Sequence, residues 1–279
     1  MNAKSVFFAT IAAVLIAAVS PTVFSHGAAQ DRLHRLEHEI EHHPDDPALY
    51  VKRGRVYRDA EQWDNALNDF VSALKIDRQY HEARYWQGEA LMQKGDLRGA
   101  EQVLKKYITQ VPDSPSGNRT LSQVLMQLHK YPQAAYYLDQ TIQHDSRPPP
   151  QVFLERARAL ANITPLPTRR IVAGLKKGLV KHPRNVVIIN ELVRIYELAE
   201  QRDSALAAID LLPSRLRDSP KWLNRRAQIE MHRGHRKRAL DLYRQTIAKI
   251  DALPEQRRRL PAFVHARQAA ESGISKLNL

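Results

Sequence analysis

The residues most suited to chemistry are histidines near the start of the chain. Five of the twelve histidines fall between His26 and His43. A helix turns about 100° per residue, so His34, His38 and His42 would share one helix face. Imidazoles four residues apart can chelate zinc or copper(II), and cleavage before His26 would add a free α-amine as a further ligand. We therefore predict a metal site of His26, His34, His38 and His42.

The same histidines lie opposite an apolar stripe. Leu33, Leu36 and Ile40 recur at spacings of three and four residues and would pack this helix against its neighbour. The histidines would then face solvent. The alternative interpretations are a solvated helix face, or a partner surface that responds to pH.

No other motif in the sequence indicates catalysis. None of the ten glycines forms a phosphate-binding loop after a strand, and no serine lies in a strand-to-helix elbow. The absence of cysteine excludes thiolate chemistry. We expect a protein that is not an enzyme and that needs no cofactor, apart from zinc or copper at the histidines.

Three consecutive 34-residue stretches, 47–80, 81–114 and 115–148, make up the regular middle of the chain. Each reads as two amphipathic helices joined by a short polar turn. A small residue lies in the middle of each first helix, an alanine near the start of each second helix, and a bulky residue one turn later: Gly54, Gly88 and Ser122; Ala66, Ala100 and Ala134; Phe70, Leu104 and Leu138. A fixed period of this length is typical of stacked helical repeats.

These stretches resemble tetratricopeptide repeats (TPRs), and we identify the chain as similar to exported bacterial members of that family. The second copy carries Gly88, Ala100 and Pro112 on the family pattern. The other copies depart from it, with Arg78 and Ser146 where proline is usual. The resemblance implies an all-α, right-handed superhelical solenoid.

The register continues less regularly beyond the third copy. We expect a histidine-rich capping helix at 26–46, three regular repeats at 47–148, degenerate repeats at 149–253 and a C-terminal capping helix at 254–279, giving about six repeats. A hinge at Pro148–Pro150 between two lobes is the alternative arrangement.

The resemblance also implies a partner-binding groove on the inner face of the first helices. The family's lysine-and-asparagine clamp for a terminal carboxylate is not reproduced. The positions that the resemblance assigns to the groove are Arg55, Arg58, Tyr85, Glu89, Met92, Arg119, Gln123, Met126, Arg156, Asn190, Arg194, Asn224, Gln228 and Met231.

The N-terminus has the pattern of a signal peptide. Lys4 precedes the apolar run Val6–Val19, Ser20 and Pro21 interrupt that run, and cleavage is expected before His26. Residues 1–25 are therefore predicted to direct the protein to the periplasm or to secretion. An uncleaved anchor in the inner membrane is the alternative.

The formal net charge of +13 is concentrated in the second half of the chain. Few aromatic residues accompany the basic ones, and the predicted export also argues against a nucleic-acid partner. An anionic membrane surface or an acidic protein is a more suitable partner. The predicted basic patch consists of Arg225, Arg226, Arg233, Arg236, Lys237 and Arg238.

Taken together, the residues favour a non-catalytic scaffold outside the cytoplasm that binds a peptide or partner protein in its groove. One alternative is a zinc or copper accessory or delivery factor that uses the histidine-rich helix. Another is a membrane-surface assembly factor that uses the basic C-terminal half.

Overall fold

The computed structural model describes residues 21–278, with side chains from Ala29 to Leu277. Over these residues the secondary structure is helical and contains no strand, which confirms the predicted all-α class. Most of the predicted signal peptide and the side chain of His26 lie outside the described residues. Among the helices that are described, none combines the length and apolar character needed to cross a membrane.

The helices group into two compact units, Met1–Ala90 and Leu91–Leu279. The first unit contains α1 (Pro21–His42), α2 (Pro47–Asp59), α3 (Trp63–Ile76) and most of α4 (His81–Lys94). The second contains α5 (Leu97–Gln110), α6 (Pro115–Gln127), α7 (Tyr131–His144), α8 (Pro150–Ala161), α9 (Thr168–Lys181), α10 (Val186–Leu198), α11 (Arg202–Asp210), α12 (Ser214–Arg217), α13 (Pro220–His232), α14 (Arg236–Asp251), α15 (Glu255–Arg258) and α16 (Pro261–Asn278).

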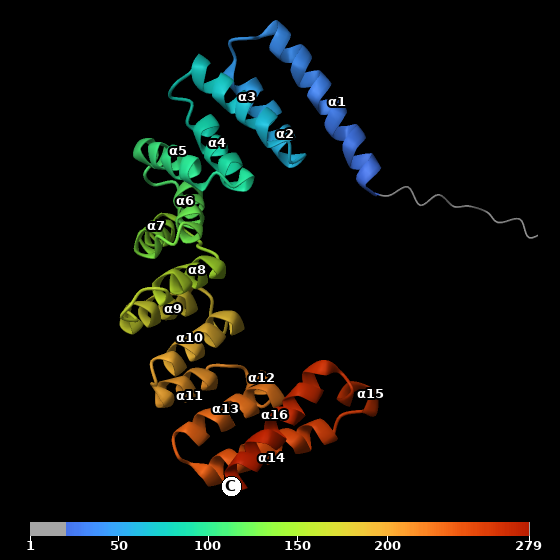
Figure 1. Cartoon of the computed structure of the whole chain (residues 1–279), viewed down its shortest axis with the longest axis vertical. Coiled ribbons are helices and arrows are strands. Elements are labelled where there is room, and N and C mark those ends of the chain that lie inside the picture. Colours follow the sequence, from blue (N-terminus) through green and yellow to red (C-terminus); the bar gives the residue numbers. More distant parts are fainter. Residues whose placement is uncertain (1–20, 279) are drawn as a thin grey trace, which may run out of the picture. The chain divides into compact units, whose positions relative to one another are not determined.

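Unit 1 is built around the packing of α2 against α3, with α1 alongside α2 (Figure 1). Its core contains Phe70, whose ring is fully buried, among buried alanines of α3 and α4. A Cβ at Gly54 would lie only 2.6 Å from Cε1 of Phe70. The small residue in the middle of the first helix therefore makes room for the bulky residue of the second, as the repeat pattern predicts.

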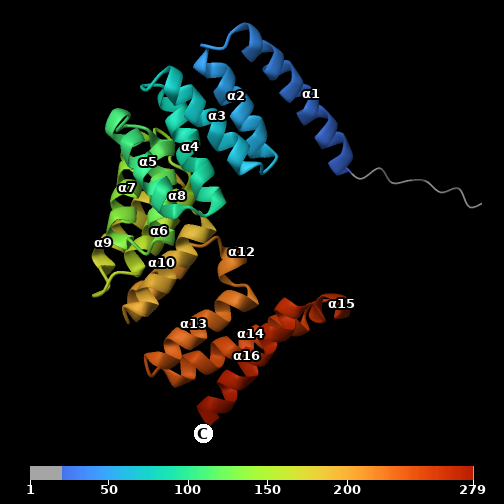
Figure 2. The same ribbon diagram turned by 45° about the horizontal axis from the view of Figure 1, so that its top comes forward.

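Unit 2 continues the pairing through α6–α7, α8–α9, α10–α11 and α13–α14, and α16 packs against both α13 and α14 (Figure 2). The segment Pro148–Pro150 is not a boundary between compact units, because α7 and α8 pack together across it. Pro149 has an extended backbone and is the N-cap of α8, and Pro150 occupies its first turn. Proline is suited to that position because a first-turn residue needs no N–H donor, so these prolines start a helix.

The turns α2–α3, α4–α5, α6–α7, α10–α11 and α13–α14 share one backbone feature, which the turn α8–α9 lacks. A residue with positive φ occurs at Glu61 (56°), Gly95 (92°), His129 (58°), Glu200 (54°) and Gly234 (80°). The first three are 34 residues apart in sequence, and so are the last two. Only Gly95 and Gly234 adopt this left-handed conformation without steric cost. The repeat period is thus present in the backbone geometry as well as in the packing.

Replacing Gly54 with alanine should destabilise the helix pair α2–α3, because the added Cβ would overlap the ring of Phe70. Overpacking of this kind costs about 1–3 kcal/mol, measured as the free energy of unfolding in urea. The double variant Gly54→Ala/Phe70→Leu should show less than the sum of the two single losses, because leucine leaves the ring position empty. Strictly additive losses would contradict this packing.

Candidate functional site

A cavity of unit 2 brings together predicted groove residues. It has a volume of about 620 Å³. Its lining comes from the end of α4 and the α4–α5 turn, from α6, from α7 and from α8, and consists of Met92, Gln93, Gly95, Ser122, Gln123, Met126, Gln127, Leu138, Glu155 and Arg158. We call this site the Met92–Met126 pocket.

The pocket combines apolar and amide side chains. Met92, Met126 and Leu138 supply the apolar surface, and methionine adapts its shape to different apolar ligands. Gln123 and Gln127 supply amides, each of which can both donate and accept hydrogen bonds. Such a lining suits an apolar side chain together with the backbone that carries it.

Two charged side chains of α8, Glu155 and Arg158, also line the pocket. Arg119 donates two hydrogen bonds to Glu155, with its Nε 3.0 Å and a terminal nitrogen 2.8 Å from the carboxylate oxygens. This bidentate pair joins α6 to α8 across 36 residues of sequence and neutralises the carboxylate. Arg158 also lines the pocket but is exposed, and within the described part of the chain its guanidinium has no ion pair. The pocket therefore presents one cation that is available to an anionic ligand.

A buried carboxylate links α5 to the turn between α6 and α7, two helices that line the pocket. Glu101 of α5 is only 7% exposed. It accepts hydrogen bonds from Lys105 at 2.7 Å and from Lys130, in the α6–α7 turn, at 2.6 and 2.9 Å. Burial raises the pKa of Glu101, but hydrogen bonds and charge from the two lysines outweigh burial, so its pKa is lowered below 4.5. The ionised carboxylate thereby ties α5 to the helix pair that carries Met126.

Glu101→Gln should lower the free energy of unfolding at neutral pH by about 1–3 kcal/mol, because charge-assisted hydrogen bonds from two lysines are weakened. The folded pKa lies below the ordinary value, so this stabilisation is present above about pH 4.5 and is lost as the pH falls through the folded pKa. Urea titrations between pH 7 and about pH 3.5 should show the difference from wild type closing in acid. Glu200→Gln is the control, because the Glu200 side chain is 78% exposed and its ion pair with Arg202 is long, at 3.6 Å. This variant should change the free energy of unfolding little at either pH. If Glu101→Gln lowered the free energy of unfolding by the same amount at every pH, the ionised carboxylate would not be the stabilising group.

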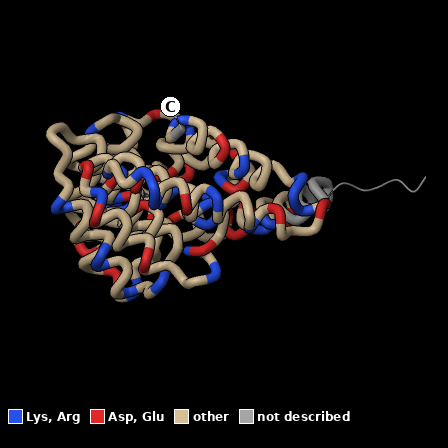
Figure 3. Tube along the Cα trace, turned by 90° about the horizontal axis from the view of Figure 1, so that it is seen from below, with Lys and Arg blue, Asp and Glu red and all other residues tan. Residues whose placement is uncertain are grey.

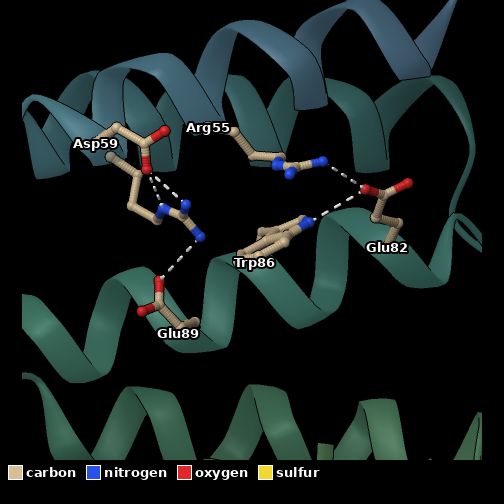
Figure 4. A network of polar contacts seen from close by, with 6 residues as sticks. Arg55, Asp59, Glu82, Trp86 and Glu89 are labelled. Carbon is tan, nitrogen blue, oxygen red and sulfur yellow. Dashed lines mark hydrogen bonds and ion pairs between the residues drawn. The ribbon is translucent and has the colours of Figure 1, made fainter. Parts of the chain in front are cut away.

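Unit 1 gathers other predicted groove residues around a tryptophan. Figure 4 shows Arg55 and Asp59 of α2 facing Glu82, Trp86 and Glu89 of α4. The guanidinium of Arg55 lies 4.8 Å from the Trp86 ring centroid, which is a cation–π distance. The indole Nε1 of Trp86 donates to Glu82 at 3.2 Å. Arg55, which was predicted for the groove, therefore contacts the ring of Trp86 and lies 3.5 Å from Glu82.

Arg58 belongs to the same cluster. Its guanidinium lies 4.3 Å from the Trp86 centroid, donates to Asp59 at 2.5 Å and is 4.0 Å from Glu89. Sequence reasoning missed Trp86, although it is one of only three tryptophans and lies in the first helix of the second repeat. These contacts hold both arginines within unit 1, so the cluster orders the surface of α2 and α4.

The structure places two predicted groove residues in the core instead. Arg156 is 9% exposed, and it donates to Asp139 of α7 and to the carbonyl of Arg170 in α9. Asn224 is 6% exposed and donates to the carbonyl of Ala266 in α16 at 2.7 Å. Both predictions are wrong because neighbouring helices cover these positions, which the repeat register alone does not reveal. The other predicted groove residues are partly or fully exposed.

The groove positions in α10 and α13 are tied into polar contacts. Arg194 donates to Glu191 at 2.6 and 2.9 Å, and Asn190 accepts from Arg225 at 2.8 Å. Gln228 lines a cavity of about 350 Å³ with two glutamates, Arg202 and His232. This smaller cavity lacks the paired methionines of the Met92–Met126 pocket.

The predicted basic patch is largely neutralised by partners in the chain. Glu230, 1% exposed, is contacted by Arg233 at 2.9 Å, His235 at 2.9 Å and Arg238 at 3.2 Å. Arg233 also pairs with Asp203 at 2.5 Å. Acidic segments accordingly lie among the basic ones along the trace (Figure 3).

Three of the four remaining members of the basic patch also have partners in the chain. Arg225 pairs with Glu197 at 2.7 Å, Arg226 with Asp210 at 3.5 Å, and Arg236 donates to the carbonyl of Leu277. Lys237 alone among the six has no polar side-chain contact within the described residues. Binding of an anionic membrane stays a prediction, and it would have to compete with these internal pairs.

The histidine-rich helix brings two of its predicted ligands together. The Nε2 atoms of His38 and His42 are 3.3 Å apart, whereas Nδ1 of His34 is 3.4 Å from Glu37. Among the described residues no group of three or more histidine, aspartate or glutamate side chains is placed to hold a metal. The structure thus joins a pair where the sequence predicted four ligands.

Comparison with known proteins identifies the repeat. Residues 51–115 match the model of a tetratricopeptide repeat family. The fold is similar to that of YrrB, a TPR protein with an unusual peptide-binding site, with a TM-score of 0.55 and 18% identity over 63% of this chain and 89% of that one. A search of the curated proteins finds no match.

Two further solved structures share the fold. The MamA protein matches with a TM-score of 0.54 and 17% identity, covering 60% of this chain and 90% of its own. A tetratricopeptide repeat protein from Parabacteroides merdae ATCC 43184 matches with a TM-score of 0.51 and 12% identity, covering 90% and 95% of the two chains. At these identities the likeness concerns the fold alone.

Proposed function

We propose that this chain, whose residues 51–115 match a tetratricopeptide repeat family, is a non-catalytic scaffold that binds an extended segment of another protein in the Met92–Met126 pocket. The observation that carries the proposal is the meeting of Met92, Gln123 and Met126 in one cavity. These three residues come from two successive repeats, and the family resemblance assigns all three to a binding groove.

The lining of the pocket defines the segment that would fit. An apolar side chain would contact Met92, Met126 and Leu138, and the glutamines would bind the backbone beside it. Arg158, which has no ion pair with any described residue, would bind a carboxylate next to the apolar residue. The net charge of +13 would favour the approach of an acidic partner. The proposed ligand is therefore an extended acidic segment that carries a large apolar residue.

One further observation supports protein binding. YrrB, which has a similar fold, is described as having a peptide-binding site. For location, the proposal follows the N-terminal sequence pattern and places the scaffold in the periplasm or outside the cell.

Selection from a random peptide display library on the full chain tests this proposal. Enriched peptides should carry a large apolar residue beside aspartate or glutamate. Met126→Glu should weaken their binding by about tenfold or more, since a charge in an apolar contact costs at least about 1.4 kcal/mol. Arg158→Glu should reverse the preference for acidic neighbours.

Arg169→Glu provides the matched control, because Arg169 is an exposed arginine of the same unit that does not line the pocket. It makes the same charge change and should alter binding by less than about twofold, or roughly 0.4 kcal/mol. Failure to enrich any peptide, or enriched peptides that bind Met126→Glu and Arg158→Glu as tightly as wild type, would overturn the proposal.

A further inference from the structure

We infer that His38 and His42 form a zinc-binding chelate near the C-terminal end of α1. This site is separate from the Met92–Met126 pocket and does not depend on the function proposed for it. The inference rests on the separation of the two Nε2 atoms, on their position in the helix and on their exposure to solvent.

The separation of the imidazole nitrogens matches a tetrahedral ion. Zinc–nitrogen bonds are about 2.0–2.1 Å long, so two nitrogen ligands at a tetrahedral angle lie about 3.3–3.4 Å apart. The Nε2 atoms of His38 and His42 are 3.3 Å apart. Ligands at right angles around copper(II) would be about 2.8–2.9 Å apart, so that geometry would require the two rings to move closer. The observed separation of the two nitrogens therefore equals that of two ligands of a tetrahedral zinc ion, and only the ring orientations would have to adjust.

The position of the pair in α1 favours a cation. α1 is a 22-residue helix, and His42 is its last residue. Carbonyl groups at the C-terminal end of a helix carry partial negative charge, which attracts cations to the last turn. His38 lies one turn earlier, so the helix backbone holds both imidazoles on one side and fixes their spacing.

Both side chains are exposed, so an ion can reach them from water. Their rings are 4.5 Å apart, centroid to centroid, and meet edge to face. Without metal, such a pair can share one hydrogen bond, in which one Nε2 donates and the other accepts. Zinc would bind both Nε2 atoms when each ring carries its proton on Nδ1, so the Nε2 proton would move to Nδ1 of the same ring by exchange with water. Water would complete the coordination, because no third ligand lies with the pair among the described residues.

The proposed site contains two of the four histidines that the sequence predicted as ligands. His34 is also four residues from His38, but its Nδ1 lies 3.4 Å from Glu37 Oε2 and its ring is not paired with His38. His34 and His38 therefore provide a direct test of the geometry, because helix spacing alone would allow either neighbour to chelate with His38.

Calorimetric titration of zinc chloride into the full chain tests the inference. One saturable zinc should bind, and His38→Gln and His42→Gln should each weaken its binding by about tenfold or more, because each removes one of two protein ligands. His34→Gln is the matched control on the same helix and should change binding by less than about twofold. Circular dichroism of each variant should show unchanged helix content, since all three positions are exposed.

Three results would overturn the chelate. The first is no saturable zinc binding by the full chain, which would leave only a hydrogen bond between the two rings. The second is loss of binding in His34→Gln with no effect of His42→Gln, which would place the ion one turn earlier. The third is binding that survives the double variant His38→Gln/His42→Gln, which would place it elsewhere.

Discussion

Each repeat depends on the close approach of two helices at a position without a large side chain. Phe70 occupies the space that a side chain at Gly54 would need. Ala66, Ala100 and Ala134, which recur at the same position in three repeats, are completely buried. At these positions the repeats specify shape and little else, because alanine and glycine offer no polar group beyond the backbone. The chemistry of the chain is therefore left to the helix faces that packing does not cover.

The recurrence of small residues at these positions made part of the fold predictable from the sequence. The helix pairs from α2 to α7 follow directly from the 34-residue period, because size and spacing are local properties of the sequence. Met92, Gln123 and Met126 could be assigned to one surface for that reason. Leu138 and Arg158 could not, because they reach the pocket from a second helix and from the next repeat.

Coverage by distant segments accounts for the errors. No residue near Asn224 in the sequence indicates that Ala266, 42 residues later, lies over it. Arg156 was misplaced for a similar reason, since its partners come from the helices before and after α8. The pairing of charged residues could not be predicted from the sequence either. Counting arginines along the chain finds a basic segment, but only the structure shows Arg225 beside Glu197 and a single buried glutamate, Glu230, beneath several cations.

α16 completes the packing of the last helix pair of unit 2. α16 packs against α13 and α14, where it binds Asn224 and places Gly273 against the ring of Tyr243. In a stacked array this is the surface on which the next repeat would lie. α16 therefore takes the position that a helix of a further repeat would occupy. It buries Ala227, Ala239 and Tyr243, which would otherwise face water.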